Sequence, residues 1–150
     1  MRLRKGRKED IDECISIAEE LNNYFEETGL SVMDSDLGKH EFIVAEDDGN
    51  IVGFLVYDEK NEYVVEISWM AVRYEKRRKG IGSSLLKELE ELMQDKKVIM
   101  VKTLARKEKY EPYEHTRRFY ENKGFFLLET IDPYPGWDEG NPAAVYLKII

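Results

Sequence analysis

The chain has 150 residues, of which 42% are hydrophobic, 11% are aromatic and 36% are charged, and its formal net charge is −8. This length fits one compact domain with its own core, and the composition excludes a disordered chain. The acidic balance disfavours a nucleic-acid partner and an anionic membrane surface, so we expect neither.

The few cysteines and histidines limit the compartment and the metal chemistry. Cys14 is the only cysteine, which excludes an internal disulfide, and its apolar neighbours at helical spacing predict a small buried side chain. No apolar leader follows the basic N-terminal residues and no run is long enough to cross a bilayer, so we expect a cytoplasmic protein. His40 and His115 stand far apart without cysteine partners, and we therefore expect no metal site.

Apolar periodicity places the elements of the first half. Residues 1–4 predict a short strand and residues 10–21 predict an amphipathic helix. Residues 22–40 give mixed signals, which leave open a second helix or two short helical pieces.

A meander of three strands is expected next, over residues 41–46, 51–57 and 63–72. The first two are joined at residues 47–50, which read Asp-Asp-Gly-Asn and tolerate the positive φ of a tight hairpin turn.

The second half begins with a basic, glycine-rich segment at residues 73–82 that opens a helix. One apolar stripe runs along that helix: Ile81, Leu85, Leu86, Leu89, Leu92 and Met93. Residues 97–104 predict a strand, and residues 114–123 predict a helix that ends at Gly124.

The last expected elements are strands at residues 125–131 and 144–150, joined by a loop at 132–142 that is rich in proline, glycine and aromatic residues. The element order predicts an α+β domain with a mixed sheet.

The chemistry centres on the segment between the third strand of the meander and the helix after it. The residues predicted to bind a phosphate there are Arg77, Arg78, Lys79, Gly80, Ile81, Gly82, Ser83 and Ser84. Helix N-termini expose unpaired N–H groups, glycines let the backbone approach a ligand, and basic and hydroxyl side chains add donors. The alternative is a basic turn that caps a surface helix.

Two better-known phosphate motifs are excluded. A P-loop requires a lysine directly after its second glycine, and neither Gly80 nor Gly82 is followed by one. A dinucleotide-binding fingerprint requires a third glycine at position 85, where Leu85 stands.

The pattern Arg77-x-x-Gly80-x-Gly82 resembles the signature of the GCN5-related N-acetyltransferase (GNAT) superfamily, with Met70-Ala71-Val72 before it and Leu85-Leu86 after it. Residues 119–125, Phe-Tyr-Glu-Asn-Lys-Gly-Phe, resemble the C-terminal helix and strand of that family. The resemblance implies a mixed, mostly antiparallel sheet of six to seven strands flanked by about four helices. It also implies a single N-acetyltransferase domain over residues 1–150.

By the same resemblance, the protein transfers an acetyl group from acetyl-CoA to a primary amine by direct attack in a ternary complex, without a metal. Backbone groups of Met70, Ala71 and Val72 would contact the pantetheine arm, and the amide of Met70 or Ala71 would polarise the thioester carbonyl. Tyr113 stands where many members have asparagine, which leaves open whether it replaces a cofactor contact.

Acetyl transfer to an amine requires removal of a proton from the amine and benefits from an acid for the leaving thiolate. Tyr120 is the candidate acid and matches the tyrosine of the family, and the alternative is a core aromatic residue beside Phe119. Glu66 is the candidate base, directly or through a water, because it is a lone carboxylate in an apolar strand and resembles the catalytic glutamate of histone-type members. The alternative is a partly exposed strand carboxylate.

The resemblance also implies that the acceptor site forms from the region of the first two helices and from the last hairpin loop. Glu26, Tyr134 and Trp137 combine a carboxylate with aromatic faces, which together can hold a cation. We therefore favour a cationic small molecule, such as a polyamine or an amino sugar, as the acceptor. A protein lysine or N-terminus, a non-catalytic acyl-CoA sensor, and a merely rigid loop with solvated acids are the alternatives. The protein is expected to be a monomer or a homodimer.

Overall fold

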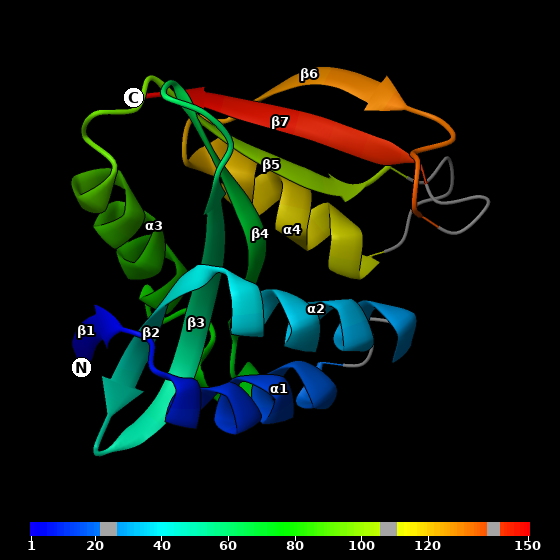
Figure 1. Ribbon diagram of the computed structural model, residues 1–150. Helices are drawn as coiled ribbons and strands as arrows, with labels where there is room; N and C mark the ends of the chain where they lie inside the picture. Colours follow the sequence, from blue (N-terminus) through cyan, green and yellow to red (C-terminus); the bar gives the residue numbers. More distant parts are fainter. Residues whose placement is uncertain (22–26, 106–110, 138–141) are drawn as a thin grey trace. The chain divides into compact units, whose positions relative to one another are not determined.

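The computed structural model describes residues 1–21, 27–105, 111–137 and 142–150, and the side chains of residues 27–28 and 111–113 are also outside the description (Figure 1). The chain divides into two compact units. The first unit consists of Met1–Glu59 and Ile67–Gln94, and the second consists of Lys60–Glu66 and Asp95–Ile150. Each unit is described by itself below.

The first unit combines strands with three of the described helices. Its elements are β1 (Arg2–Lys5), the short 3-10 helix η1 (Lys8–Asp10), α1 (Ile11–Glu20), α2 (Glu27–Lys39), β2 (Glu41–Asp47), β3 (Asn50–Glu59), most of β4 (Val64–Val72), a second 3-10 helix η2 (Tyr74–Lys76) and α3 (Ile81–Leu92). β2 pairs antiparallel with β1 and with β3. The turn between β2 and β3 has positive φ at Asp48 (52°) and Gly49 (80°), which confirms the predicted hairpin.

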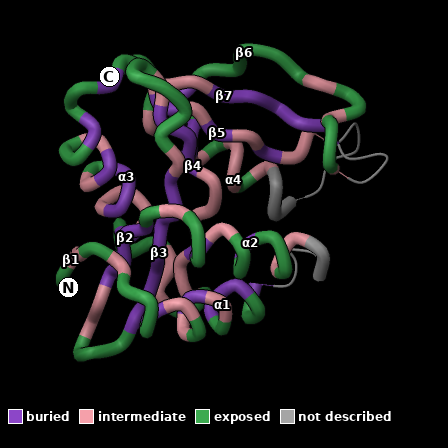
Figure 2. Tube along the Cα trace, viewed as in Figure 1, coloured by how far each residue is buried: buried purple, intermediate pink, exposed green. Residues whose placement is uncertain are grey.

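The core of the first unit lies where α1 and α2 meet the strands. Cys14, Ile17, Met33 and Phe54 are fully buried there, and Figure 2 shows buried segments along α1 and β3. Cys14 therefore is the small buried side chain that its spacing predicts.

A partly buried ion-pair network links the start of the chain to β2. Arg4 on β1 binds both oxygens of Asp10 at 2.8 and 2.9 Å, and its Nε lies 2.7 Å from Glu46 on β2. The hydrogen bonds from Arg4 hold the pKa of Asp10 below its usual value, against the opposing effect of burial. The same guanidinium lowers the pKa of Glu46.

The second unit contains the first residues of β4 and the C-terminal elements. These are β5 (Val98–Leu104), α4 (Glu111–Asn122), β6 (Phe126–Ile131) and β7 (Ala143–Ile149). β7 pairs antiparallel with β5 on one side and with β6 on the other. The hydrogen-bonded order of the strands is β1-β2-β3-β4-β5-β7-β6.

The described residues thus form a seven-stranded sheet and four α-helices, as predicted. Of the two alternatives for residues 22–40, a single helix α2 is present, with residues 22–26 outside the description. α4 begins at Glu111, three residues earlier than predicted, so that Pro112 lies in its first turn, where a missing N–H is tolerated. Within the described ranges, no helix is both long and apolar enough to cross a membrane.

Candidate functional site

The predicted phosphate-binding residues lie at the N-terminus of α3, in the first unit. Gly80 is the residue that precedes the helix, and no side chain caps it. The first backbone bond of the helix runs from the Ser84 N–H to the Gly80 carbonyl at 2.9 Å. The N–H groups of Ile81, Gly82 and Ser83 come before that bond, so the helix itself offers them no acceptor. Three backbone donors at a positive helix end are therefore available to an anion.

The backbone that leads into the helix has an unusual conformation at two positions. Gly80 has a φ of 77° and Arg78 a φ of 64°, which is uncommon for a residue with a side chain. Left-handed residues in such a turn direct successive N–H groups into a concavity that suits an anion. Arg78 and Lys79 are exposed, and Arg77 lies over the ring of Tyr74 with its guanidinium carbon 5.7 Å from the centroid.

The structure limits what Ser84 contributes. Its amide is used by the Gly80 carbonyl, and its side chain lines a cavity of about 290 Å³ together with Leu3 of β1 and Lys87 of α3. Among the predicted phosphate ligands, Ser84 therefore offers its hydroxyl but not its N–H.

Gly53 on β3 is a positioning residue that sequence reasoning missed. A Cβ added to Gly53 would lie 3.1 Å from the Ala71 carbonyl oxygen and 3.1 Å from Cγ2 of Ile81. The first turn of α3 thus packs closely against β3 and β4 only because position 53 lacks a side chain. A glycine inside an otherwise apolar strand was the available signal.

The backbone contacts of β4 show which N–H groups of residues 70–73 face β3. The Arg73 N–H bonds the Val52 carbonyl at 2.8 Å, and the Ala71 carbonyl oxygen lies beside Gly53, so both residues direct their backbone groups toward β3. By alternation along the strand, the N–H groups of Met70 and Val72 point to the opposite edge. Of the two candidates for polarising a carbonyl, Met70 is therefore the one whose N–H points away from β3.

Tyr120 lies in the last turn of α4, in the second unit, where the helix end fixes its position. The Phe125 N–H bonds the Tyr120 carbonyl at 3.0 Å, the Gly124 N–H bonds Glu121 at 3.1 Å, and Gly124 has a φ of 94°. These bonds form a Schellman cap, as the predicted end at Gly124 requires. The Tyr120 ring packs edge-on against Phe125 and Phe119 at 5.1 and 5.2 Å.

Tyr120 is 4% exposed, and burial raises the pKa of its phenol. The phenol therefore keeps its proton throughout the neutral range.

Glu66 is more enclosed than either sequence interpretation assumed. It is 5% exposed, so the alternative of a partly exposed carboxylate is wrong. Its Oε1 lies 3.0 Å from the Lys60 ammonium and its Oε2 lies 3.0 Å from the Lys102 ammonium, with all three residues in the second unit. Two opposite charges compensate the burial of the carboxylate.

Lys102 of β5 connects Glu66 to the last hairpin loop. Its ammonium donates a hydrogen bond of 2.7 Å to the Tyr134 hydroxyl and lies 4.7 Å from the centroid of the same ring. Burial alone would lower the pKa of Lys102, but the hydrogen bonds to Tyr134 and Glu66 outweigh it and raise that pKa. Sequence reasoning missed Lys102, because a lysine in an alternating strand reads as an ordinary solvent-facing residue.

The aromatic pair predicted for acceptor binding, Tyr134 and Trp137, already makes contacts within the protein. The rings of Tyr134 and Trp137 pack at a centroid distance of 5.1 Å, and the backbone N–H of Trp137 donates to the Tyr134 carbonyl at 3.1 Å. The cation at the Tyr134 ring is Lys102 of the protein itself. Glu26 and the side chain of Tyr113 lie outside the described residues.

Comparison with known families decides the assignment. Residues 38–126 match the model of the acetyltransferase (GNAT) domain, which covers more than half of the chain. The chain belongs to the GNAT family of acetyltransferases. Members of this family use acetyl-CoA, and solved structures that resemble the chain include ones with coenzyme A or acetyl-CoA bound.

Solved GNAT structures also share the fold over nearly the whole length. A GNAT-family protein from Desulfovibrio desulfuricans is 19% identical, with 99% of this chain and 98% of that chain covered and a TM-score of 0.84. The aminoglycoside 6'-N-acetyltransferase from Enterococcus faecium is 17% identical, with 99% and 97% covered and a TM-score of 0.75. The ribosomal-protein-S18-alanine N-acetyltransferase from Escherichia coli is 15% identical, with 99% and 93% covered and a TM-score of 0.77. Comparison with curated protein sequences finds no match.

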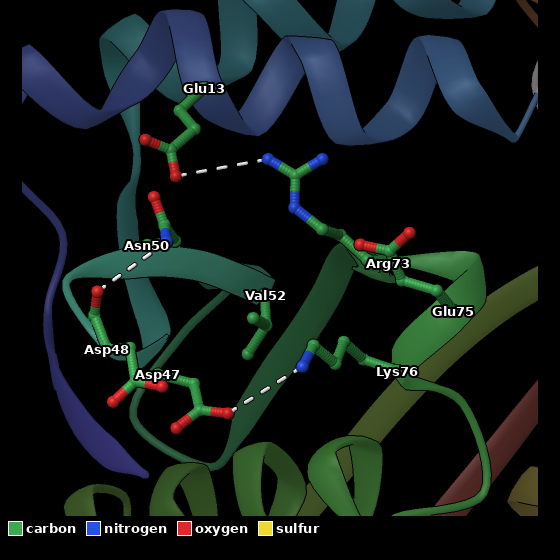
Figure 3. A pocket seen from close by; sticks show the side chains of 8 residues that line it. All are labelled: Glu13, Asp47, Asp48, Asn50, Val52, Arg73, Glu75 and Lys76. Atoms are coloured by element: carbon green, nitrogen blue, oxygen red, sulfur yellow. Dashed lines mark hydrogen bonds and ion pairs between the residues drawn. The ribbon is translucent and has the colours of Figure 1, made fainter.

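One cavity of this GNAT protein lies away from its signature residues. Its volume is about 500 Å³, and it is lined by Glu13, Asp47, Asp48, Asn50, Val52, Arg73, Glu75 and Lys76. Figure 3 shows charges paired around it, with Arg73 4.0 Å from Glu13 and Lys76 3.9 Å from Asp47. None of the predicted site residues lines it, so its size does not identify it with the acetyl-transfer site.

Two further groups of this GNAT protein bear on its chemistry. Burial raises the pKa of the Cys14 thiol to about 12, which makes it a poor nucleophile. Within the described residues, no group of three or more His, Cys, Asp and Glu side chains is placed to hold a metal ion.

Proposed function

We propose that this GNAT acetyltransferase binds acetyl-CoA at the N-terminus of α3 and transfers the acetyl group to a primary amine by direct attack in a ternary complex. One observation carries the proposal. The amides of Ile81, Gly82 and Ser83 stand without a helical acceptor, directly after left-handed Arg78 and Gly80. Such an arrangement suits the diphosphate of a coenzyme.

Different residues would contact different parts of the cofactor. The three amides and the side chains of Arg78 and Lys79 would hold the diphosphate, through directed donors and positive charge. The N–H groups of Met70 and Val72 would pair with the pantetheine arm, since they point away from β3. When bound, the cofactor supplies the acetyl thioester.

Tyr120 and Glu66 would handle the protons. The Tyr120 hydroxyl keeps its proton because burial raises its pKa, so it donates a hydrogen bond to the sulfur as negative charge develops there. Glu66 would accept the proton of the attacking amine through a water. Each carboxylate oxygen has a second lone pair beside the one facing a lysine, which can accept a hydrogen bond from that water.

For the acceptor we favour a cationic small molecule, such as a polyamine or an amino sugar. The net charge of −8 attracts cations, and Trp137 presents a half-buried indole beside Tyr134. A protein lysine or N-terminus is the second candidate, in keeping with the range of acceptors named for structures of this fold.

The experiment combines thiol release with cofactor binding. Thiol release from acetyl-CoA with a panel of amines, together with mass spectrometry of acetylated lysate proteins, separates the acceptors. A protein that binds acetyl-CoA but releases no thiol with any acceptor would be a sensor, not an enzyme.

The binding site itself is tested by Gly82→Trp, which places a large side chain where the backbone must approach the diphosphate. We expect loss of acetyl-CoA binding by calorimetry. Gly38→Trp is the matched control, because Gly38 is exposed on α2 with nothing within 4 Å of its added Cβ, and it should bind normally. Normal binding by Gly82→Trp would refute the assignment.

A further inference from the structure

Strand β5 carries a buried hydroxyl group that makes no hydrogen bond. Thr103 is 7% exposed, and its Oγ1 is the only fully enclosed side-chain oxygen or nitrogen of the described residues that lacks a hydrogen-bond partner. Burying a hydroxyl without a partner destabilises a fold, and valine has nearly the same shape as threonine without the polar atom. The hydroxyl of Thr103 therefore indicates a partner that the described residues do not supply.

Strand pairing shows that Thr103 faces α4. Val101 stands opposite Tyr146 in the ladder between β5 and β7, and the Tyr146 hydroxyl donates a hydrogen bond of 3.3 Å to Glu121 of α4. Directly paired residues share one face of a sheet, and so do residues two apart on one strand. Thr103 therefore lies on the face that α4 covers, whereas its neighbour Lys102 points to the opposite face.

The part of α4 that lies over Thr103 is the part that carries Tyr120. Arg117 of α4 donates a hydrogen bond of 2.7 Å to the carbonyl of Leu104, the residue after Thr103, and Figure 1 shows α4 running alongside β5. Arg117 and Tyr120 are three residues apart, so they share one side of the helix. Tyr120 is 4% exposed. The layer between β5 and the end of α4 thus contains two buried residues that carry a hydroxyl group, Thr103 and Tyr120, both in the second unit.

The chemistry of acetyl-CoA offers a partner for a hydroxyl at this place. Tyr120 is the proposed donor to the cofactor sulfur, and the pantetheine arm next to that sulfur contains secondary amides. Each of these amides has one N–H donor and one carbonyl acceptor. A threonine hydroxyl can donate one hydrogen bond and accept others, so it can bind either group of such an amide. The neutral hydroxyl also matches a neutral amide, since neither group brings an uncompensated charge into a buried layer.

We propose that the Thr103 hydroxyl binds an amide of the pantetheine arm of acetyl-CoA, next to the sulfur that Tyr120 contacts. This inference rests on the proposed function, because it takes the place of the sulfur from the role of Tyr120. Thr103 would hold the arm without moving a proton of the reaction. It is a side-chain contact on β5, a strand for which the sequence predicts no cofactor residue.

Two substitutions separate the hydroxyl of Thr103 from the shape of its side chain. Thr103→Val keeps the shape and removes the hydroxyl. We expect it to weaken acetyl-CoA binding about three- to tenfold in calorimetry, the range of a single hydrogen bond, while the Tm of the ligand-free chain stays the same or rises. Thr103→Ser keeps the hydroxyl and removes a buried methyl group, so it should lower the Tm but bind acetyl-CoA like the wild type. A threonine with a purely structural role, or one that binds only water, would not produce these opposite effects.

A fragment of the cofactor shows which part Thr103 contacts. The wild type and Thr103→Val should bind 3′-phospho-ADP equally, because this nucleotide lacks the pantetheine arm. Thr130→Val is the matched control, since Thr130 is exposed on β6 of the same unit, and it should change neither acetyl-CoA affinity nor Tm. The inference alone is overturned if Thr103→Val binds acetyl-CoA like the wild type, if Thr103→Ser binds it as weakly as Thr103→Val, or if 3′-phospho-ADP shows the same loss. A wild-type chain that binds no acetyl-CoA would refute the proposed function, and this inference with it.

Discussion

Replacing Glu66 by glutamine distinguishes a catalytic base from a structural carboxylate. Glu66→Gln keeps the shape of the side chain but removes its charge, which leaves the ammonium groups of Lys60 and Lys102 without their shared partner. The Lys60 side chain is 40% exposed and can turn to water. The Lys102 side chain is 19% exposed and remains tied to Tyr134, so it carries most of the penalty.

The size of that penalty follows from the exposure of Lys102. Breaking a fully buried ion pair costs about 3–5 kcal/mol, whereas an exposed pair contributes about 0–1 kcal/mol. Lys102 lies between these limits and keeps one hydrogen bond, so we expect a loss of about 1–2 kcal/mol. For a chain of this length, that corresponds to a fall in Tm of about 2–8 °C.

Thermal unfolding and the pH dependence of kcat are measured on the same protein. A base role predicts a loss of about 10²–10⁴ in kcat and the disappearance of the acid limb of the pH profile. A purely structural role predicts the fall in Tm with the shape of the pH profile unchanged. Glu62→Gln is the matched control, since Glu62 is an exposed carboxylate of the same unit and should change neither quantity.

The result that would refute the electrostatic reasoning is an unchanged Tm in Glu66→Gln. The double variant Glu66→Gln/Lys102→Met checks it from the other side. Because it also removes the uncompensated ammonium, it should be more stable than Glu66→Gln alone.

Three other substitutions test separate parts of the structure. Tyr120→Phe should lower kcat far more than acetyl-CoA affinity, and an unchanged kcat would remove Tyr120 from the donor role. Gly53→Ala should push the first turn of α3 away from β3. We expect the free energy of unfolding in urea to fall by about 1–3 kcal/mol and acetyl-CoA binding to weaken. Wild-type values for both would show that the first turn of α3 moves without cost. Arg4→Met removes the group that lowers the pKa of Asp10, a contribution to stability that is present above the unfolded pKa of about 4 and is lost as pH falls through the folded value. The stability gap between the wild type and Arg4→Met should therefore be widest near neutral pH and narrow in acid, and a constant gap in urea unfolding at both pH values would contradict this linkage.

Local chemistry made the backbone features predictable. The positive φ at Asp48 and Gly49 and the cap at Gly124 follow from residues that tolerate a left-handed backbone, so each is visible in a few adjacent positions. The segment proposed to bind the diphosphate is of the same kind, because its glycines and the apolar stripe after them lie close together in the sequence. The left-handed conformation of Arg78 was not predictable, because a residue with a side chain adopts it only when its surroundings require it.

The contacts around Glu66 were not predictable, because they join residues that only the tertiary structure brings together. Lys60, Glu66, Lys102 and Tyr134 come from a turn, two strands and a loop, and nothing in the spacing from Glu66 to Lys102 marks them as partners. The need for glycine at position 53 was not predictable for the same reason, because it arises from the close approach of Ile81 on α3. Spacing along the chain therefore pointed to Glu66 as the proposed base, whereas its contacts with Lys60 and Lys102 depend on the tertiary structure.

The backbone-based diphosphate site and the side-chain surroundings of Glu66 respond differently to substitution in a GNAT protein. The proposed diphosphate site is made of peptide N–H groups, which every residue except proline possesses, so it constrains conformation at Arg78 and Gly80 more than side-chain identity. The surroundings of Glu66 are made of side chains, and each replacement there changes charge or shape directly. Lys102 contributes both charge and shape to these surroundings. Its ammonium pairs with Glu66 and lies over the ring of Tyr134. We therefore expect Lys102→Met to alter the ranking of acceptor amines in the thiol-release assay while leaving acetyl-CoA affinity unchanged. A uniform loss of activity toward every amine would instead assign Lys102 to stability alone.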